Sequence, residues 1–235
     1  MQRLADLEGI NGLEFHDALI GDVRYSAADR NLSVGLSIYE TMASGGRTPA
    51  FLSVQSMDRA TVRMDFPKLA SNAFAGTVMN CRVDTEENVA RLYLCGGLLE
   101  VASKSQSLEP SELPPSVFNG HEGNVLAGSF RDLETWDLAF SVLSNIEVST
   151  NTARCTIALQ LPSGEGVSER RGAVLRLSRC TSCVLTLDGR NLSRPEGRYG
   201  NVQNVHVDAR RGIVWLYLQD GLIEVRARAA ELVAR

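Results

Sequence analysis

The segment Gly76-Thr-Val-Met-Asn-Cys-Arg-Val-Asp84 returns later in the chain as Gly200-Asn-Val-Gln-Asn-Val-His-Val-Asp208. The segment Leu92-Tyr-Leu-Cys-Gly-Gly-Leu-Leu-Glu-Val101 also returns, as Leu216-Tyr-Leu-Gln-Asp-Gly-Leu-Ile-Glu-Val225. The offset is 124 residues in both cases, and 12 of the 26 aligned positions are identical without a gap. Repetition at a constant offset indicates that one structural unit occurs twice in the chain.

The repeat extends toward the N-terminus as an apolar pattern at an offset of 123 residues. Phe51-Leu-Ser-Val54 corresponds to Val174-Leu-Arg-Leu177. We therefore expect two copies of one unit, residues 1–108 and 136–235. The intervening residues 109–135 contain a proline-rich stretch and a glycine-containing one, and we expect a linker there because proline is excluded from helix interiors and central strands.

Each unit has the pattern of a β-rich fold. Asn31-Leu-Ser-Val-Gly-Leu-Ser-Ile-Tyr39 alternates apolar and small polar residues, which is typical of a strand with one buried face. Gly76–Asp84, Val89–Leu94 and Leu98–Ala102 are predicted to form a meander, and 51–57 is expected to pair with 61–66 as a hairpin. The predicted fold is mainly β, with α+β left open: two tandem antiparallel units, each a sandwich or an open barrel.

Composition restricts the class of protein. The chain has 235 residues, of which 44% are hydrophobic and 22% are charged, as in ordinary globular proteins. It has no apolar run of the length that a membrane span needs, so no membrane partner is expected. The segment Met1–Glu8 carries acidic residues where a signal peptide needs an apolar core, and the five cysteines form no disulfide framework. These features predict a cytoplasmic protein.

Charge is distributed unevenly between the two copies. Residues 1–110 carry a net charge of -4, and residues 136–235 carry +3. The second copy is rich in arginine, and its candidate basic face comprises Arg170, Arg171, Arg176, Arg179, Arg190, Arg194, Arg198, Arg210 and Arg211. Aromatic residues are not interleaved with these arginines, which disfavours nucleic-acid binding. We expect solvation of these side chains, or intramolecular docking of the basic copy against the acidic one.

His16 and Asp17 form the first candidate site. An adjacent His-Asp pair can hold a metal, but such sites need further ligands, and the chain has only three histidines. The second copy has Ala139 and Phe140 at the corresponding positions. Either Asp17 accepts hydrogen bonds from backbone N–H groups in a structural role, or the pair is a binding site of the first copy alone.

Cys180-Thr-Ser-Cys183 is the second candidate. By alignment it occupies a two-residue hairpin turn, with the two cysteines as a cross-strand pair. A single Cys-x-x-Cys is a weak zinc signal, and only Cys155 and His206 are plausible further ligands. We expect no metal and no cofactor, and we interpret these cysteines as small side chains that fill apolar positions.

The phrase Phe15-His16-Asp17-Ala18, followed by a strand, a turn and a strand, and the closing Leu92–Val101 segment carry a resemblance. They resemble a loose group of small bacterial β-domains with a His-Asp-Ala opening, some of which are similar to immunity proteins of polymorphic toxin systems. The second copy lacks this opening. The resemblance implies a non-enzymatic binding role and transfers no catalytic residue.

Three hypotheses for function follow. The first is a non-catalytic protein-binding module, in one form an immunity-like inhibitor of a toxin, whose partner is another protein. The second is a structural or assembly protein in which duplication replaces a homodimer. The third is an enzyme that uses His16. We favour the first hypothesis, because no recognisable catalytic motif accompanies His16.

Overall fold

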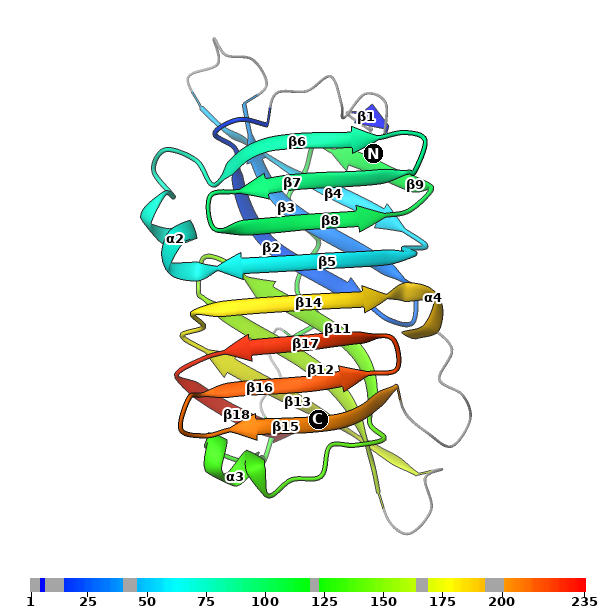
Figure 1. Ribbon diagram of the computed structural model, residues 1–235, viewed down its shortest axis with the longest axis vertical. Coiled ribbons are helices and arrows are strands. Elements are labelled where there is room, and N and C mark those ends of the chain that lie inside the picture. Colours follow the sequence, from blue (N-terminus) through cyan, green and yellow to red (C-terminus); the bar gives the residue numbers. More distant parts are fainter. Residues whose placement is uncertain (1–4, 7–14, 40–45, 119–122, 164–168, 193–200) are drawn as a thin grey trace.

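The computed structural model describes the whole chain except residues 1–4, 7–14, 40–45, 119–122, 164–168 and 193–200. Two antiparallel sheets lie face to face, and the strands of the rear sheet run obliquely to those of the front sheet (Figure 1). Neither sheet closes on itself. The predicted mainly β fold is confirmed, in the form of a sandwich and not of a barrel.

The ten-stranded sheet has the order β1-β9-β4-β3-β2-β11-β12-β13-β18-β10. Its strands are β1 (Ala5–Asp6), β2 (Leu19–Ser26), β3 (Asn31–Ile38), β4 (Thr48–Gln55), β9 (Ser105–Glu109), β10 (Val125–Ala127), β11 (Val142–Ser149), β12 (Arg154–Pro162), β13 (Arg170–Ser178) and β18 (Ala229–Ala234).

The eight-stranded sheet has the order β15-β16-β17-β14-β5-β8-β7-β6. Its strands are β5 (Arg59–Asp65), β6 (Val78–Asp84), β7 (Val89–Leu94), β8 (Gly97–Ala102), β14 (Ser182–Asp188), β15 (Val202–Asp208), β16 (Ile213–Leu218) and β17 (Gly221–Arg226). Short helices α2 (Phe66–Ser71) and α4 (Gly189–Leu192) follow β5 and β14 on opposite sides of the molecule (Figure 1).

Alternation along the strands builds the core between the sheets. In β5, for example, Ala60, Val62 and Met64 are buried, whereas the residues between them are exposed or half-buried. The predicted meander is confirmed as β6–β7–β8. The expected hairpin of residues 51–57 with 61–66 is wrong, because β4 and β5 belong to different sheets. The short connection between them crosses from one layer to the other.

Both sheets run without interruption from one copy into the other. Strand β2 pairs with β11, which places Arg24 opposite Glu147, and β5 pairs with β14, which places Val62 opposite Leu185. At the offset of 123 residues, each of these pairs joins equivalent positions of the two copies. This register is the one that a two-fold axis through the centre of both sheets produces.

The central pair in the ten-stranded sheet shows what fusion of the copies permits. Arg24 Nε lies 3.0 Å from Glu147 Oε2, and both side chains are largely buried. In a symmetric homodimer the same residue would face itself at this position, and two like charges would repel. Because both copies lie on one chain, the two positions carry opposite charges.

The same backbone conformations recur in both copies. Residues with positive φ lie at equivalent positions: Asp17 and Phe140, Arg30 and Ala153, Ser56 and Arg179, Asn88 and Gly212. Thr77 Oγ1 accepts a hydrogen bond from Ile20 N at 2.8 Å, and its equivalent Asn201 Oδ1 accepts one from Leu143 N at 2.7 Å. These buried polar contacts join the two sheets in each copy.

The segment that connects the copies is part of the fold over much of its length. Leu113 packs on Gly35 of β3, where an added Cβ would lie 2.8 Å from Leu113 Cδ1. Later in the segment, β10 pairs with β18, and α3 (Phe130–Glu134) follows it. The pairing of β10 with β18 corresponds to that of β1 with β9. The second unit's first strand therefore lies inside residues 109–135, which the sequence assigns to a linker.

Candidate functional site

His16 and Asp17 lie at a surface turn before β2. His16 Nδ1 is 3.0 Å from Asp17 Oδ2, and the two side chains are 65% and 51% exposed. The backbone turn recurs in the second copy: Asp17 N donates to Val78 O, and Phe140 N donates to the equivalent Val202 O. The Asp17 carboxylate has His16 as its one partner within the described residues, so the expected capping of backbone N–H groups is not seen there.

Three of the candidate metal ligands lie in the apolar core and the fourth lies apart from them. Cys155, Cys180 and Cys183 are buried, whereas His206 is on the edge strand β15, stacked on Trp215 with ring centroids 5.2 Å apart. The expected hairpin around Cys180-Thr-Ser-Cys183 is wrong, because β13 and β14 belong to different sheets. Within the described part of the chain, no three His, Cys, Asp or Glu side chains lie close enough together to share a metal ion.

Two of these thiols, Cys155 and Cys180, have raised pKa values that keep them protonated. The Cys183 thiol beside it and the loss of solvent raise the pKa of Cys155 well above its usual range, and burial raises the pKa of Cys180 to about 12. A zinc ligand or a nucleophile needs the thiolate form. The environment of these residues therefore opposes both chemistries.

The arginines of the second copy are spread over several elements. Arg170, Arg171 and Arg176 belong to β13, Arg190 to α4, and Arg210 and Arg211 to the turn between β15 and β16. Arg194 and Arg198 lie outside the described residues. Arg171 lies over the Trp136 ring, and Arg176 pairs with Glu231. The described arginines do not make one continuous basic face.

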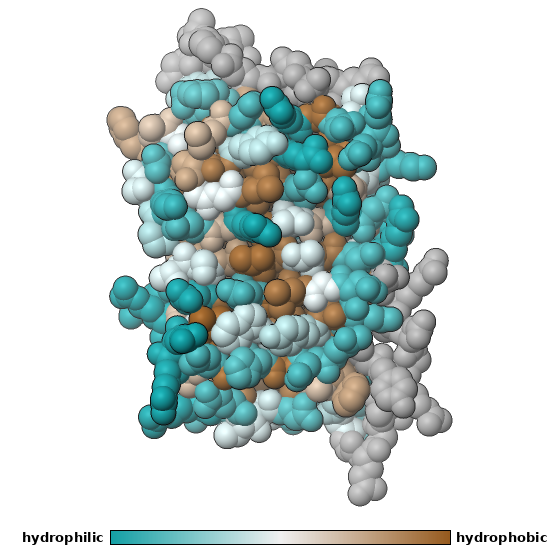
Figure 2. Space-filling model, in the orientation of Figure 1, coloured by the Kyte–Doolittle hydropathy of each residue, from teal (hydrophilic) through white to brown (hydrophobic). Residues whose placement is uncertain are grey.

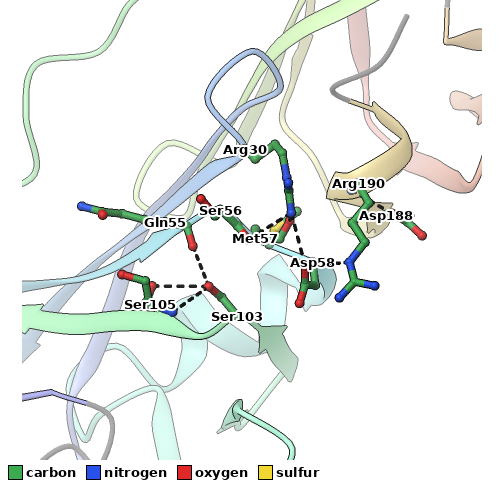
Figure 3. Close-up of polar contacts among 9 residues, drawn as sticks. All are labelled: Arg30, Gln55, Ser56, Met57, Asp58, Ser103, Ser105, Asp188 and Arg190. Atoms are coloured by element: carbon green, nitrogen blue, oxygen red, sulfur yellow. Dashed lines mark hydrogen bonds and ion pairs between the residues drawn. The ribbon is translucent and has the colours of Figure 1, made fainter. Parts of the chain in front are cut away.

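Arg190 bridges the two copies. Asp58 Oδ1 lies 2.8 Å from Arg190 Nε and 3.2 Å from an Nη of Arg30 (Figure 3). The hydrogen bond from Arg190 lowers the pKa of Asp58. Two-fold related backbone contacts flank the β5–β14 pair: Gly189 N donates to Asp58 O beside this cluster, and Phe66 N donates to Thr181 O at the opposite end. This cluster joins the two halves through side-chain and backbone contacts.

The outward face of the eight-stranded sheet has an organisation that the sequence analysis did not identify. Strand register aligns its side chains in rows across all eight strands. One row runs through Asn80, Tyr93, Leu98, Arg63, Val184, Glu224, Trp215 and His206. The next row is its two-fold equivalent: Arg82, Arg91, Glu100, Thr61, Thr186, Leu222, Tyr217 and Asn204. We call these two rows the sheet face.

Apolar and aromatic side chains gather in the middle of the sheet face. Leu98, Val184 and Leu222 are half-buried there, and Tyr217 is 42% exposed. Figure 2 shows this side of the molecule, with hydrophobic residues gathered in the centre, some hydrophilic side chains among them and more hydrophilic residues around them. Register places Arg63 between Leu98 and Val184. A protein interface has the same layout, with an apolar centre, aromatic side chains and a polar rim.

The two copies contribute differently to the sheet face. Arg91 pairs with Glu100 at 2.6 Å, and the equivalent Trp215 donates from Nε1 to Glu224 at 2.9 Å. In both copies the residue on the third strand from the edge is a glutamate that accepts a hydrogen bond, but the donor is an arginine in the first copy and a tryptophan in the second. Three other first-copy positions of the rows, Arg82, Arg63 and Thr61, correspond to His206, Thr186 and Val184. The first copy's part is therefore more basic and the second copy's part more apolar.

Two cations on the sheet face have no acidic partner among the described residues. Arg63 and Arg82 are exposed and make no ion pair among the described residues. Glu100 is paired with Arg91, whereas Glu224 accepts a hydrogen bond from the uncharged indole of Trp215 and keeps its negative charge. The two rows thus hold three arginines, Arg63, Arg82 and Arg91, against two glutamates. The net charge on this surface is therefore positive, although the chain as a whole carries -4.

One signal in the sequence pointed to the sheet face. Tyr93 alternates with Leu92 and Leu94, which are buried, so its side chain must point outward. Identity between the copies is highest in these strands, which by itself fits a shared core, an edge pairing or the constraints of the fold. Of the 12 identical residues, only Val78, Leu92, Leu94 and Val101 belong to the buried core, and Tyr93 and Leu98 are among those outside it.

Comparison with known proteins adds no relative. A scan against protein-family models and searches among curated proteins and solved structures found no match to this chain. No helix in the described residues has the length and apolar character needed to cross a membrane.

Proposed function

We propose that the protein is a non-catalytic protein-binding module and that the sheet face is its binding surface. The observation that carries this proposal is the half-buried apolar centre on an open sheet, formed by Leu98, Val184 and Leu222 with Tyr93 and Tyr217 beside them. Aromatic side chains in such a setting supply large contact area at low entropic cost. Exposure of these apolar side chains to water is unfavourable, and a flat partner surface would remove them from water.

The charges of the sheet face select the partner's chemistry. Arg63 and Arg82 would meet carboxylates, while Trp215 and Leu222 would meet apolar side chains. The partner is therefore a protein with an apolar patch that is acidic on the side facing the first copy. Complementary charge speeds encounter and fixes orientation, and it makes association sensitive to salt.

An immunity-like inhibitor is the specific form of this function that the His-Asp-Ala resemblance suggests. Proteins encoded beside this gene are then the first partners to test, each by co-purification with the full-length chain and titration calorimetry. We expect one of them to bind, and Leu222→Asp to weaken binding at least about 100-fold, because a charge would be buried in the interface. Raising the salt concentration should weaken binding further.

The matched control is Ser53→Asp, which places the same charge on β4 of the ten-stranded sheet. Both variants must melt near the wild-type temperature for the comparison to hold. Binding that Leu222→Asp leaves intact, or that Ser53→Asp abolishes equally, would contradict the assignment of the sheet face. Failure of every neighbouring product to bind would contradict the immunity-like form.

The internal two-fold axis favours a second candidate, an assembly protein in which duplication has replaced a homodimer. The pairings of β2 with β11 and of β5 with β14 are those of a symmetric dimer. Analytical ultracentrifugation distinguishes the two functions. A binding module without its partner should sediment as one chain, whereas an assembly protein should form larger species as its concentration rises.

A further inference from the structure

A hollow lies on the other side of the molecule, on the outer face of the ten-stranded sheet. Its volume is about 780 Å³. Strands β11, β12, β13 and β18 form its floor, and Ser116 and Phe118 of the connecting segment form a wall. The hollow is independent of the sheet face, so it is a separate candidate site.

The floor of the hollow carries a cluster of charged and hydroxyl side chains. Register places Arg176 opposite Thr156 and Arg154 opposite Ser178, so these four side chains form two neighbouring pairs on one face. Glu231 follows beside Arg176, and the two make an ion pair of 3.2 Å. Arg154 is exposed and has no partner among the described residues. One guanidinium is thus oriented by a carboxylate and a second has unused donors.

The duplication supplies an internal comparison for this cluster. The first-copy equivalents of Arg154, Arg176 and Glu231 are Asn31, Ser53 and Ser107. The backbone of the two units is otherwise closely repeated, down to the positions with positive φ. The charges therefore belong to the second copy alone, where the hollow lies, and the fold does not require them.

We propose that this hollow binds a small hydroxylated organic anion, of the class of sugar acids and sugar phosphates. The guanidinium of Arg154, with Arg176 beside it, is suited to hold a carboxylate or phosphate group. Glu231 and the hydroxyls of Thr156 and Ser178 would exchange hydrogen bonds with the ligand's hydroxyl groups. Phe118 offers an aromatic surface to the apolar face of a sugar ring. The volume falls within the range of small-molecule sites, roughly 300–1,000 Å³.

Titration calorimetry of the full-length chain tests the proposal with four probes: glucuronate, glucose 6-phosphate, glucose and inorganic phosphate. We expect saturable binding of at least one anionic sugar, with one site per chain. Glucose and inorganic phosphate should each bind at least about tenfold more weakly, because each lacks one half of the recognised chemistry. Arg154→Gln should weaken binding of the anionic sugar at least about tenfold.

The control is Arg210→Gln, which removes an exposed arginine in the turn between β15 and β16 and should leave the affinity unchanged. Arg154 is exposed, so its replacement should leave the melting temperature close to that of the wild type. The proposal is overturned if neither anionic sugar binds, if inorganic phosphate binds as tightly as they do, or if Arg154→Gln binds as well as the wild type.

Discussion

Cys155 and Cys183 approach each other from opposite sheets, and each has a fully buried side chain. Their positions explain why a Cys-x-x-Cys motif here is part of a core. Cys183 lies inward on β14, and Cys180 lies in the connection between the sheets, where its thiol donates to Leu177 O. The spacing of the two cysteines does not predict their burial in the core, because a Cys-x-x-Cys segment can form either a metal-binding turn or a connection between two sheets. Only the position of β13 and β14 in different sheets decides between them.

The buried thiols should make stability fall at high pH. In the unfolded chain a thiol ionises near 9.0, whereas burial raises the pKa of Cys180 and Cys81 in the folded protein to about 12. Between these values only the unfolded state loses protons, so rising pH favours unfolding. The free energy of unfolding should decrease by at most about 1.4 kcal/mol per pH unit for each such thiol.

Urea denaturation at about pH 8 and about pH 10.5 measures this effect. Cys180→Ala has one titrating thiol fewer, so it should lose less stability between the two pH values, although a small cavity lowers its stability at both. Tyr25 also contributes to the wild-type loss, since burial raises its pKa to about 12, and it is present in both proteins. An equal loss in wild type and variant would show that Cys180 is not shielded as described.

At the scale of elements, the strands that form hairpins were predictable and the connections between sheets were not. Strands β6, β7 and β8 are joined by short turns, and the local pattern of alternation and glycine identifies them. The step from β4 to β5 has an equally short turn around Met57, with Ser56 in a left-handed conformation. A turn of that length is compatible with a hairpin and with a crossing between sheets. Which of the two forms depends on how the apolar side chains of β4 and β5 are buried in the completed fold.

Gly97 and its equivalent Gly221 allow the last hairpin of each meander to approach the central strands. A Cβ on Gly97 would lie 1.8 Å from Arg63 O, and one on Gly221 would lie 2.3 Å from Thr186 O. We expect Gly97→Ala and Gly221→Ala each to lower the free energy of unfolding by about 2 kcal/mol or more, because backbone would have to move. Denaturant titration provides the measurement.

Gly46→Ala is the matched control for this pair, since a Cβ at Gly46 meets nothing within 4 Å. It should change the free energy of unfolding by less than about 0.5 kcal/mol. If Gly97→Ala alone destabilised the protein and Gly221→Ala did not, the equivalence of the two meanders would be wrong at this contact.

At the scale of the whole molecule, the sequence predicts the repeat but not how its two copies are arranged relative to each other. The inter-copy contacts lie between β2 and β11 and between β5 and β14. They do not lie in the strands of highest identity between the copies. The net charges of the two copies do not predict the ion pairs between them. In one pair, Asp58 of the first copy meets Arg190 of the second. In the other, Arg24 of the first copy meets Glu147 of the second, so the signs are reversed. Contacts between residues more than 100 positions apart depend on the completed fold.

The central claim is that two equivalent units share each sheet about a two-fold axis, and engineered disulfides test it most directly. Thr61 lies opposite Thr186, and the two-fold equivalent of this pair is Arg63 opposite Val184. Thr61→Cys with Thr186→Cys, and Arg63→Cys with Val184→Cys, therefore place cysteines on adjacent strands within bridging distance.

The measurement is disulfide mapping by mass spectrometry after mild oxidation of the full-length chain. The control, Thr61→Cys with Leu222→Cys, spans two strand spacings, roughly 9–10 Å, which is too far for a disulfide. We predict an intramolecular disulfide in both cross-strand variants and none in the control. A disulfide in only one of the two equivalent pairs, or in the control instead, would contradict the two-fold register.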